Sequence, residues 1–120
     1  LTTNYRVLEG NEMAKYLILG SYTSTAWAAQ VKEPGNRIDA VRPMFERMGG
    51  SLESPYFAFG DYDIVGIVEM PNNITAAAMS IAVSAGGALR TFKTVPLIDE
   101  EEGVEALKKA AQMGYAPPGS

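Results

Sequence analysis

The stretch FAFGDYDIVGIVEMP, residues 57–71, decides the fold. Its central residues, Gly60–Asp63, have the composition of a turn, and the flanking runs are apolar and rich in strand formers. The pattern therefore predicts a hairpin that joins strands over 51–59 and 62–70. The same turn places two carboxylates beside a phenol, so a catalytic cluster is the alternative interpretation.

The rest of the chain supplies the partners of this hairpin. Apolar periodicity and capping residues indicate alternating strands and helices. Pro43 lies inside the second expected helix, where its ring should produce a kink. Asp99 and Glu102 match a capping box at the start of the last helix. The further elements are expected at 15–23 and 88–95 for strands, and at 24–33, 37–48, 74–85 and 100–112 for helices.

The order of these elements is β-α-β-β-α-β with an extra C-terminal helix, which is an α+β, ferredoxin-like pattern. It predicts a four-stranded antiparallel sheet with both main helices on one face. In the first strand, Leu17 and Leu19 share one side, whereas Tyr16 and Ile18 share the other. Both faces should therefore be buried. Because a second copy is the simplest cover for the free face, we expect a homodimer through the sheet faces, a dimeric α/β barrel, and leave a higher oligomer open.

Composition limits the chemistry that the chain can perform. Its 120 residues suit one domain, its net charge is −4, and it contains neither cysteine nor histidine. Disulfides, cysteine nucleophiles, histidine-dependent triads and thiolate or imidazole metal ligands are thereby excluded. The acidic balance disfavours nucleic acid and anionic membranes as partners, and no apolar run is long enough to span a bilayer. We expect no cofactor, no metal and a cytoplasmic location.

The first twelve residues differ from the rest. They are polar, lack the basic and apolar regions of a signal peptide, and precede Met13, which resembles a natural start. We expect residues 1–12 to be an N-terminal extension (an expression tag, an upstream extension of the coding sequence, or a docking arm). Residues 13–120 are expected to form the domain.

A family resemblance is carried by four segments: KYLILGSYT, LESPYFAFGDYDIVGIVEMP, NITAAAMSIAVSAGGALRTFKTVPL and APPG. Together they resemble the GYD-domain family of small bacterial and archaeal proteins, whose Gly-Tyr-Asp signature is matched by Gly60, Tyr62 and Asp63. The resemblance covers about 13–120, and residues 1–12 and Pro43 depart from it. The family is similar in fold to dimeric α/β-barrel proteins, which include small oxygenases, isomerases and stress proteins. The resemblance implies this fold and a dimer, and it implies no established activity.

The GDYD turn has two interpretations. In a site, Asp61 or Asp63 would act as a base or ligand, and Tyr62 would donate a hydrogen bond. In a plain turn, Gly60 supplies a positive φ, and Asp61 tolerates a left-handed conformation and bonds the turn backbone. Tyr62 and Asp63 have opposite parity on a strand, so only one of them can face a given cavity.

Further candidate binding residues lie on the other strands. A cation in a cleft with tyrosines would suit a small anionic or phenolic ligand. Alternatively, the two cations reach solvent at the strand ends or pair with acidic residues. The candidate ligand-binding residues are Tyr16, Tyr22, Tyr56, Arg90 and Lys93, and the acidic residues are Glu53, Asp63 and Glu69.

Two functions of different classes fit this sequence. The first is a homo-oligomeric module that binds a small ligand or serves as an accessory part of a larger protein complex. The second is a cofactor-independent enzyme, isomerase-like or oxygenase-like, that acts on a small carbonyl or aromatic substrate with Asp63 as base. A pocket on the order of a few hundred Å³ that holds a buried carboxylate would favour the enzyme.

Overall fold

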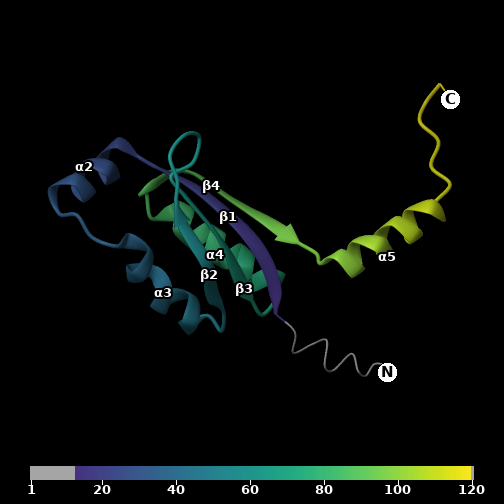
Figure 1. Ribbon diagram of the computed structural model, residues 1–120, viewed down its shortest axis with the longest axis horizontal. Helices are drawn as coiled ribbons and strands as arrows, with labels where there is room; N and C mark the ends of the chain where they lie inside the picture. The colour runs from purple at the N-terminus through teal and green to yellow at the C-terminus, as the bar shows by residue number, and fades with distance from the viewer. Residues whose placement is uncertain (1–12, 120) are drawn as a thin grey trace.

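The computed structural model describes residues 13–119, and its strands form one antiparallel sheet in the order β2-β3-β1-β4. With the four described helices, this α+β arrangement is consistent with a ferredoxin-like sandwich (Figure 1). The expected extension at 1–12 lies outside the described residues. In chain order the elements are β1 (Ala14–Tyr22), α2 (Ser24–Lys32), α3 (Arg37–Arg47), β2 (Ser51–Phe57), β3 (Ile64–Met70), α4 (Asn73–Ala85), β4 (Leu89–Leu97) and α5 (Glu100–Ala111).

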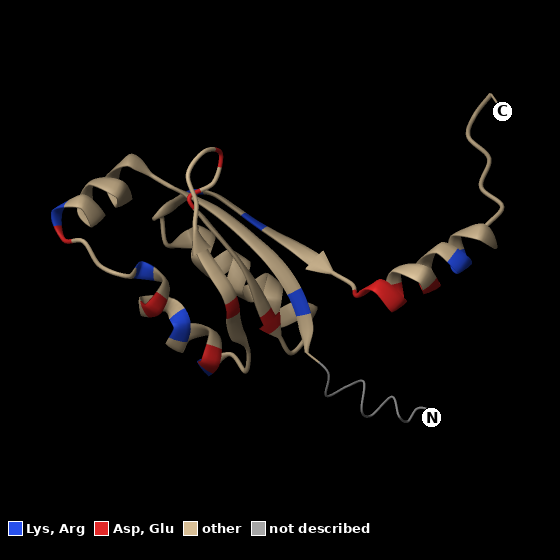
Figure 2. Cartoon of the chain, in the orientation of Figure 1, with Lys and Arg blue, Asp and Glu red and all other residues tan. Residues whose placement is uncertain are grey.

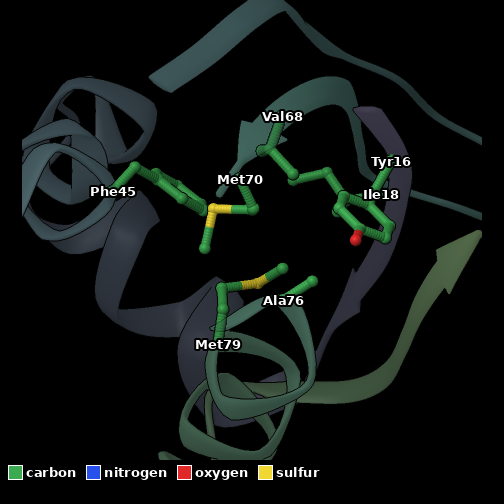
Figure 3. Close-up of a cluster of buried hydrophobic side chains, with 7 residues drawn as sticks. All are labelled: Tyr16, Ile18, Phe45, Val68, Met70, Ala76 and Met79. Carbon is green, nitrogen blue, oxygen red and sulfur yellow. The ribbon is translucent and has the colours of Figure 1, made fainter. Parts of the chain in front are cut away.

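The core lies between one face of the sheet and the helices α3 and α4 (Figure 3). Both helices contribute to the same cluster, which places them on the same side of the sheet. Alternate residues of β1 and β3 point into this layer because side chains alternate along a strand. The buried cluster consists of Tyr16, Ile18, Phe45, Val68, Met70, Ala76 and Met79.

The other face of the sheet is apolar and carries no helix of the described chain. The central strands β1 and β3 and the edge strand β4 pair in register, so their outward side chains form cross-strand rows. Helices α3 and α4 pack on the opposite side, and α5 projects beyond the end of β4 (Figure 1). We call this surface the open face, and its central residues are Leu17, Leu19, Val65, Ile67 and Val95.

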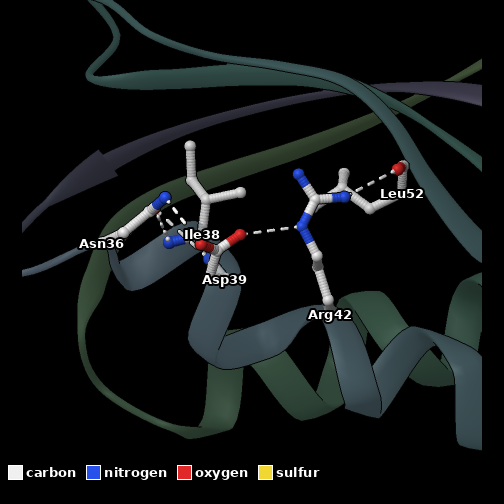
Figure 4. A network of polar contacts seen from close by, with 5 residues as sticks. All are labelled: Asn36, Ile38, Asp39, Arg42 and Leu52. Atoms are coloured by element: carbon white, nitrogen blue, oxygen red, sulfur yellow. Dashed lines mark hydrogen bonds and ion pairs between the residues drawn. The ribbon is translucent and has the colours of Figure 1, made fainter.

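Polar side chains cap the first turn of helix α3 and join the helix to β2 (Figure 4). The side chain of Asn36 accepts from the backbone N–H groups of Ile38 at 3.1 Å and Asp39 at 3.3 Å. Arg42 bonds Asp39 with its Nε at 2.9 Å and the Leu52 carbonyl with Nη1 at 3.3 Å. The exposed ion pair adds little stability, and the contact with Leu52 joins α3 to β2.

The expected order of helices and strands is confirmed, but the predicted bounds of the two hairpin strands are wrong. Strand β2 ends at Phe57 and β3 begins only at Ile64, so Tyr62 and Asp63 belong to the connection and not to the strand. The loop is closed by the Ala58 N–H, which donates to the Asp63 carbonyl at 2.7 Å. Asp63 is held there because its own N–H donates to the Gly20 carbonyl at 2.8 Å.

Two prolines lie inside regular elements. Pro43 lies inside helix α3, as predicted, and the helix continues to Arg47, while the expected kink stays a prediction. Strand β4 extends through Pro96 to Leu97, two residues beyond the expected end at Val95. A proline is tolerated there because β4 is an edge strand and needs hydrogen-bond partners on one side only.

Replacing Met79 with alanine should destabilise the fold because Met79 is 0% exposed at the centre of the core. We expect a loss of about 2–5 kcal/mol in the free energy of unfolding. Urea denaturation followed by circular dichroism measures this loss. Met113→Ala is the matched control, since Met113 is 76% exposed and its loss should change stability by less than about 0.5 kcal/mol. Similar losses for the two variants would contradict the described core.

Candidate functional site

A partly enclosed cavity of about 140 Å³ lies between the sheet and helix α3. All four strands contribute to its walls, together with α3 and the Val83 side chain of α4. The lining is aliphatic and aromatic except for Tyr22 and Arg37, which alone bring a hydroxyl and a charge. An apolar concave surface with few polar groups is the usual form of a small-molecule site.

Tyr22 reaches the cavity from the end of β1, where the pairing with β4 shifts register between Ser21 and Tyr22. The residue is buried, and its ring meets Trp27 of α2 edge to face with 5.1 Å between centroids. Burial raises the pKa of Tyr22, and the nearby charge of Asp63 also raises it, whereas Arg37 acts in the opposite direction. The phenol is therefore protonated at neutral pH and can donate a hydrogen bond.

Arg37 is the first residue of α3 and follows the Asn36 cap directly. The Asn36 cap fixes the start of this helix, so Arg37 lies at the cavity wall, and its side chain is exposed. A bulge in β2 contributes the opposite wall: Ser54 has a positive φ of 46°, and the next residue, Pro55, lines the cavity. These irregular backbone positions lie beside the cavity, where bulges often redirect side chains.

The loop Asp61–Asp63 fastens the end of β1 that carries Tyr22. The Tyr22 backbone N–H donates to Asp63 Oδ2 at 2.8 Å, and the Ser21 hydroxyl donates to the Asp61 carbonyl at 2.7 Å. With the bond from Asp63 N–H to Gly20, three successive residues of β1 are held by this loop. The Asp63 carboxylate is thus engaged by the backbone and does not line the cavity.

Gly60 has a φ of 130°, the positive value expected of a turn glycine. An added Cβ there would meet nothing within 4 Å, so the backbone conformation and not space favours glycine. Asp61 does not adopt the left-handed conformation that the turn interpretation allowed. Among the described residues other than glycine, only Ser54 has a positive φ. Asp61 contributes through its backbone carbonyl.

Tyr62 lies toward the open face. Lys93 Nζ stands 5.4 Å from the centroid of the Tyr62 ring, and a hydrogen bond to Tyr62 raises the pKa of Lys93. Because Lys93 pairs with Leu19, it belongs to the row of β4 that faces away from the helices. Tyr62 and Asp63 therefore point to different surroundings. Tyr56 lies on the same side of the sheet as the open face, because it pairs with Val65.

The remaining candidates lie apart from the cavity. Tyr16 is buried, its hydroxyl donates to Asn73 Oδ1, and burial raises its pKa. It lines a shallower hollow of about 390 Å³ between α4 and β4. Arg90 is exposed. The structure thus brings only Tyr22, of the five ligand-binding candidates, to the cavity.

The expected ion pairs of the β4 cations are replaced by others. Lys93 interacts with Tyr62, and it is Lys15 that pairs with Glu53 at 3.4 Å and with Glu69 at 3.5 Å. These pairs lie at one end of the open face and are partly exposed. They form a polar border at that end of its apolar centre.

Arg37 is the residue that sequence reasoning missed. The signal was present, because an arginine directly after a helix cap begins a helix whose apolar side packs on the sheet. We considered only cations on the strands as candidates, so Arg37 was not predicted. The cavity itself could not be predicted, since it forms where a bulge, a helix start and four strands meet.

The described residues restrict the chemistry further. No carboxylate lines the cavity, and no group of three or more acidic side chains within 13–119 is placed to hold a metal ion. Among the helices in that range, none combines the length and apolar character that crossing a membrane requires. The geometry therefore provides an apolar cavity whose lining carries one phenol and one guanidinium, both hydrogen-bond donors.

Comparison with protein families gives one match, to a model described as GYD domain, over residues 16–107. The matched segment runs from β1 into α5 and contains both the Asp61–Asp63 loop and every wall of the cavity. No curated protein matches the chain.

Asp63→Ala should lower stability by about 1–3 kcal/mol, because the buried Tyr22 N–H then loses its acceptor. Asp61→Ala is the matched control, since Asp61 acts through its backbone carbonyl, and it should change stability by less than about 0.5 kcal/mol. Chemical denaturation of both variants measures the difference. Equal losses would show that the Asp63 carboxylate does not fasten β1.

Proposed function

The chain belongs to the GYD-domain family, and from this premise we propose that it is a homo-oligomeric module that binds a small apolar ligand. The ligand is about the size of one aromatic ring and carries an anionic or phenolic group. The observation that supports this proposal is the apolar cavity whose lining has two polar side chains, Tyr22 and Arg37.

The size of the cavity sets the size of the ligand. An enclosed apolar cavity of about 150 Å³ is known to stay dry and to accept benzene. The cavity here, at about 140 Å³, is similar and is open at one side. A single ring fits inside, and a polar substituent would remain at the opening or against the polar side chains.

The polar side chains set the chemistry of that substituent. Arg37 presents a guanidinium, which binds carboxylates with two parallel hydrogen bonds and is always charged. Tyr22 presents a protonated phenol, because burial raises its pKa. Both groups donate hydrogen bonds, so a carboxylate, a phenolate or a carbonyl oxygen on the ligand matches them.

The side chains that line the cavity favour binding over catalysis. An acid–base enzyme needs a base within hydrogen-bond reach of the substrate, and Asp63, the earlier candidate, bonds the Tyr22 backbone outside the cavity. Tyr22 and Arg37 are both donors at neutral pH. This donor pair suits recognition of an acceptor on a ligand.

The homo-oligomeric part of the proposal rests on the open face. Its centre consists of Leu17, Leu19, Val65, Ile67 and Val95 across three adjacent strands. Contiguous exposed apolar surface of this kind marks an interaction site. A second open face is complementary in chemistry, and a twofold pair would put the polar border with Lys15 at the rim of the interface, as is usual.

Arg37→Gln should weaken the binding of benzoate, our probe, by at least about tenfold, because one charged hydrogen bond is worth about 1.5–3 kcal/mol. The titration can be followed through the fluorescence of Trp27, the single tryptophan, which contacts Tyr22. Arg42→Gln is the matched control, since Arg42 bonds Asp39 and Leu52 and does not line the cavity. Absence of saturable binding, or equal weakening by both variants, would contradict the proposed ligand class.

Ile67→Glu should convert the dimer to a monomer of 12.9 kDa, since it places a charge at the centre of the open face. We expect the dissociation constant to rise at least about a hundredfold, in the range of a central interface residue. Light scattering measures the mass, and circular dichroism verifies that the variant stays folded. Val31→Glu on α2, where Val31 is 75% exposed, should leave the mass unchanged. A monomeric unsubstituted protein at micromolar concentration would overturn the pairing.

A further inference from the structure

Helix α4 is apolar on the side that faces away from its own sheet. Its sequence, NITAAAMSIAVSA, contains no charged residue. One side buries Ala76 and Met79, and the opposite side leaves Ile74 82% and Ile81 69% exposed. We call this second side the outer face of α4, and its residues, at helical spacing, are Ile74, Ala77, Ala78, Ile81 and Ala85. A helix that is apolar all round is normally buried all round.

Helix α5 also has an apolar side, and none of its residues is buried. It makes no extensive contact with another described element. Val104 is 49% and Leu107 is 71% exposed, and with Ala111 they form a stripe at i, i+3 and i+7. We call these three residues the α5 stripe. In one described chain, two apolar helix surfaces thus lack a partner.

The start of α5 directs it away from its own domain. Only Ile98 and Asp99 separate it from β4, and Asp99 is extended with ψ at 176°. The capping box fixes this geometry: Asp99 accepts from the Glu102 N–H at 2.8 Å, and the Glu102 side chain accepts from the Asp99 N–H at 3.0 Å. As a result α5 extends from the end of β4 away from α4 of the same chain (Figure 1).

The charges of α5 complement the ends of α4. Figure 2 shows acidic residues at the start of α5 and basic residues near its end, whereas α4 has neither. Acidic groups are favourable beside a helix N-terminus and basic groups beside a C-terminus. If the two helices run parallel, Glu100–Glu102 lie near the start of α4 and Lys108 and Lys109 near its end.

We propose that α5 of one copy packs in parallel along the outer face of α4 of a second copy. The two helices have 12 and 13 residues, so each is about 18–20 Å long, and the shorter α5 stripe fits within the length of the outer face. With the helix starts aligned, Val104 lies level with Ala77, and Leu107 lies within one residue of Ile81 along the axis. A hollow of about 390 Å³ between α4 and β4 borders the outer face, since Ala77 and Ile81 also line it.

This contact goes beyond the ligand site and beyond the pairing of open faces. It uses the helix layer, so it can join the two chains of one dimer or link one dimer to the next. In a twofold pair the exchange is reciprocal, so the contact occurs twice and the total buried area doubles. Its charges lie at the rim and its centre is apolar, the arrangement typical of protein interfaces.

Cross-linking tests the proposal directly, because the chain has no cysteine of its own. Ile81→Cys and Leu107→Cys proteins are mixed in equal amounts, refolded together and treated with a short bis-maleimide reagent, which spans the distance of about 8–10 Å between packed helices. We expect a covalent dimer that joins position 81 of one chain to position 107 of the other. Peptide mass spectrometry identifies the joined positions.

The matched control is Ala106→Cys mixed with Ile81→Cys, since Ala106 lies on α5 away from the stripe, and this pair should lose most of the product. Three results would overturn the proposal: no 81–107 product, equal product with position 106, or dominant 81–81 linkage, which would indicate that α4 pairs with itself. A chain carrying both substitutions should also link between molecules, and linkage only within one chain would show that α5 folds back. These outcomes are independent of benzoate binding and of the Ile67→Glu result.

Discussion

The alternation of side chains along β1 is the constraint on which the rest of the structure depends. This strand is paired on both sides, with β3 and β4, so it cannot shift by one residue without moving Tyr16 and Ile18 out of the core. The same alternation leaves Leu17 and Leu19 on the open face. The core, the cavity wall at Ile18 and the apolar outer surface are therefore three consequences of one register.

Local pattern was sufficient for most of the fold and for little of the site. The strands, helices and caps follow from residue spacing within short windows, and the Asp99–Glu102 capping box was predicted residue by residue. The start of β3 at Ile64 was not predicted, because Asp63 is held by Gly20 and Tyr22, which are about 40 residues away in sequence. Contacts between residues so far apart in sequence cannot be recognised in a short stretch of sequence. Arg37 was missed for the same reason, since a cavity is defined by the elements around it.

The signature residues of the family serve the architecture in this chain. Gly60 permits the turn, Asp63 fastens the end of β1, and Tyr62 stands over Lys93 on the other side of the sheet. The loop thereby controls where Tyr22 stands relative to Trp27 and the cavity. A motif that looks reactive in sequence can thus support a cavity wall from behind without lining the cavity.

Both edge strands of the sheet contain a proline. Pro96 lies in β4, and Pro55 lies at the bulge of β2, next to Ser54 with its positive φ. Each proline lacks the N–H that an added strand would need, and the bulge bends the other edge out of line. Growth of the sheet by strands from other chains, the first step toward amyloid-like fibrils, is therefore disfavoured at both borders. The two prolines thus act against the addition of strands and leave the faces and helices of the sandwich unaffected.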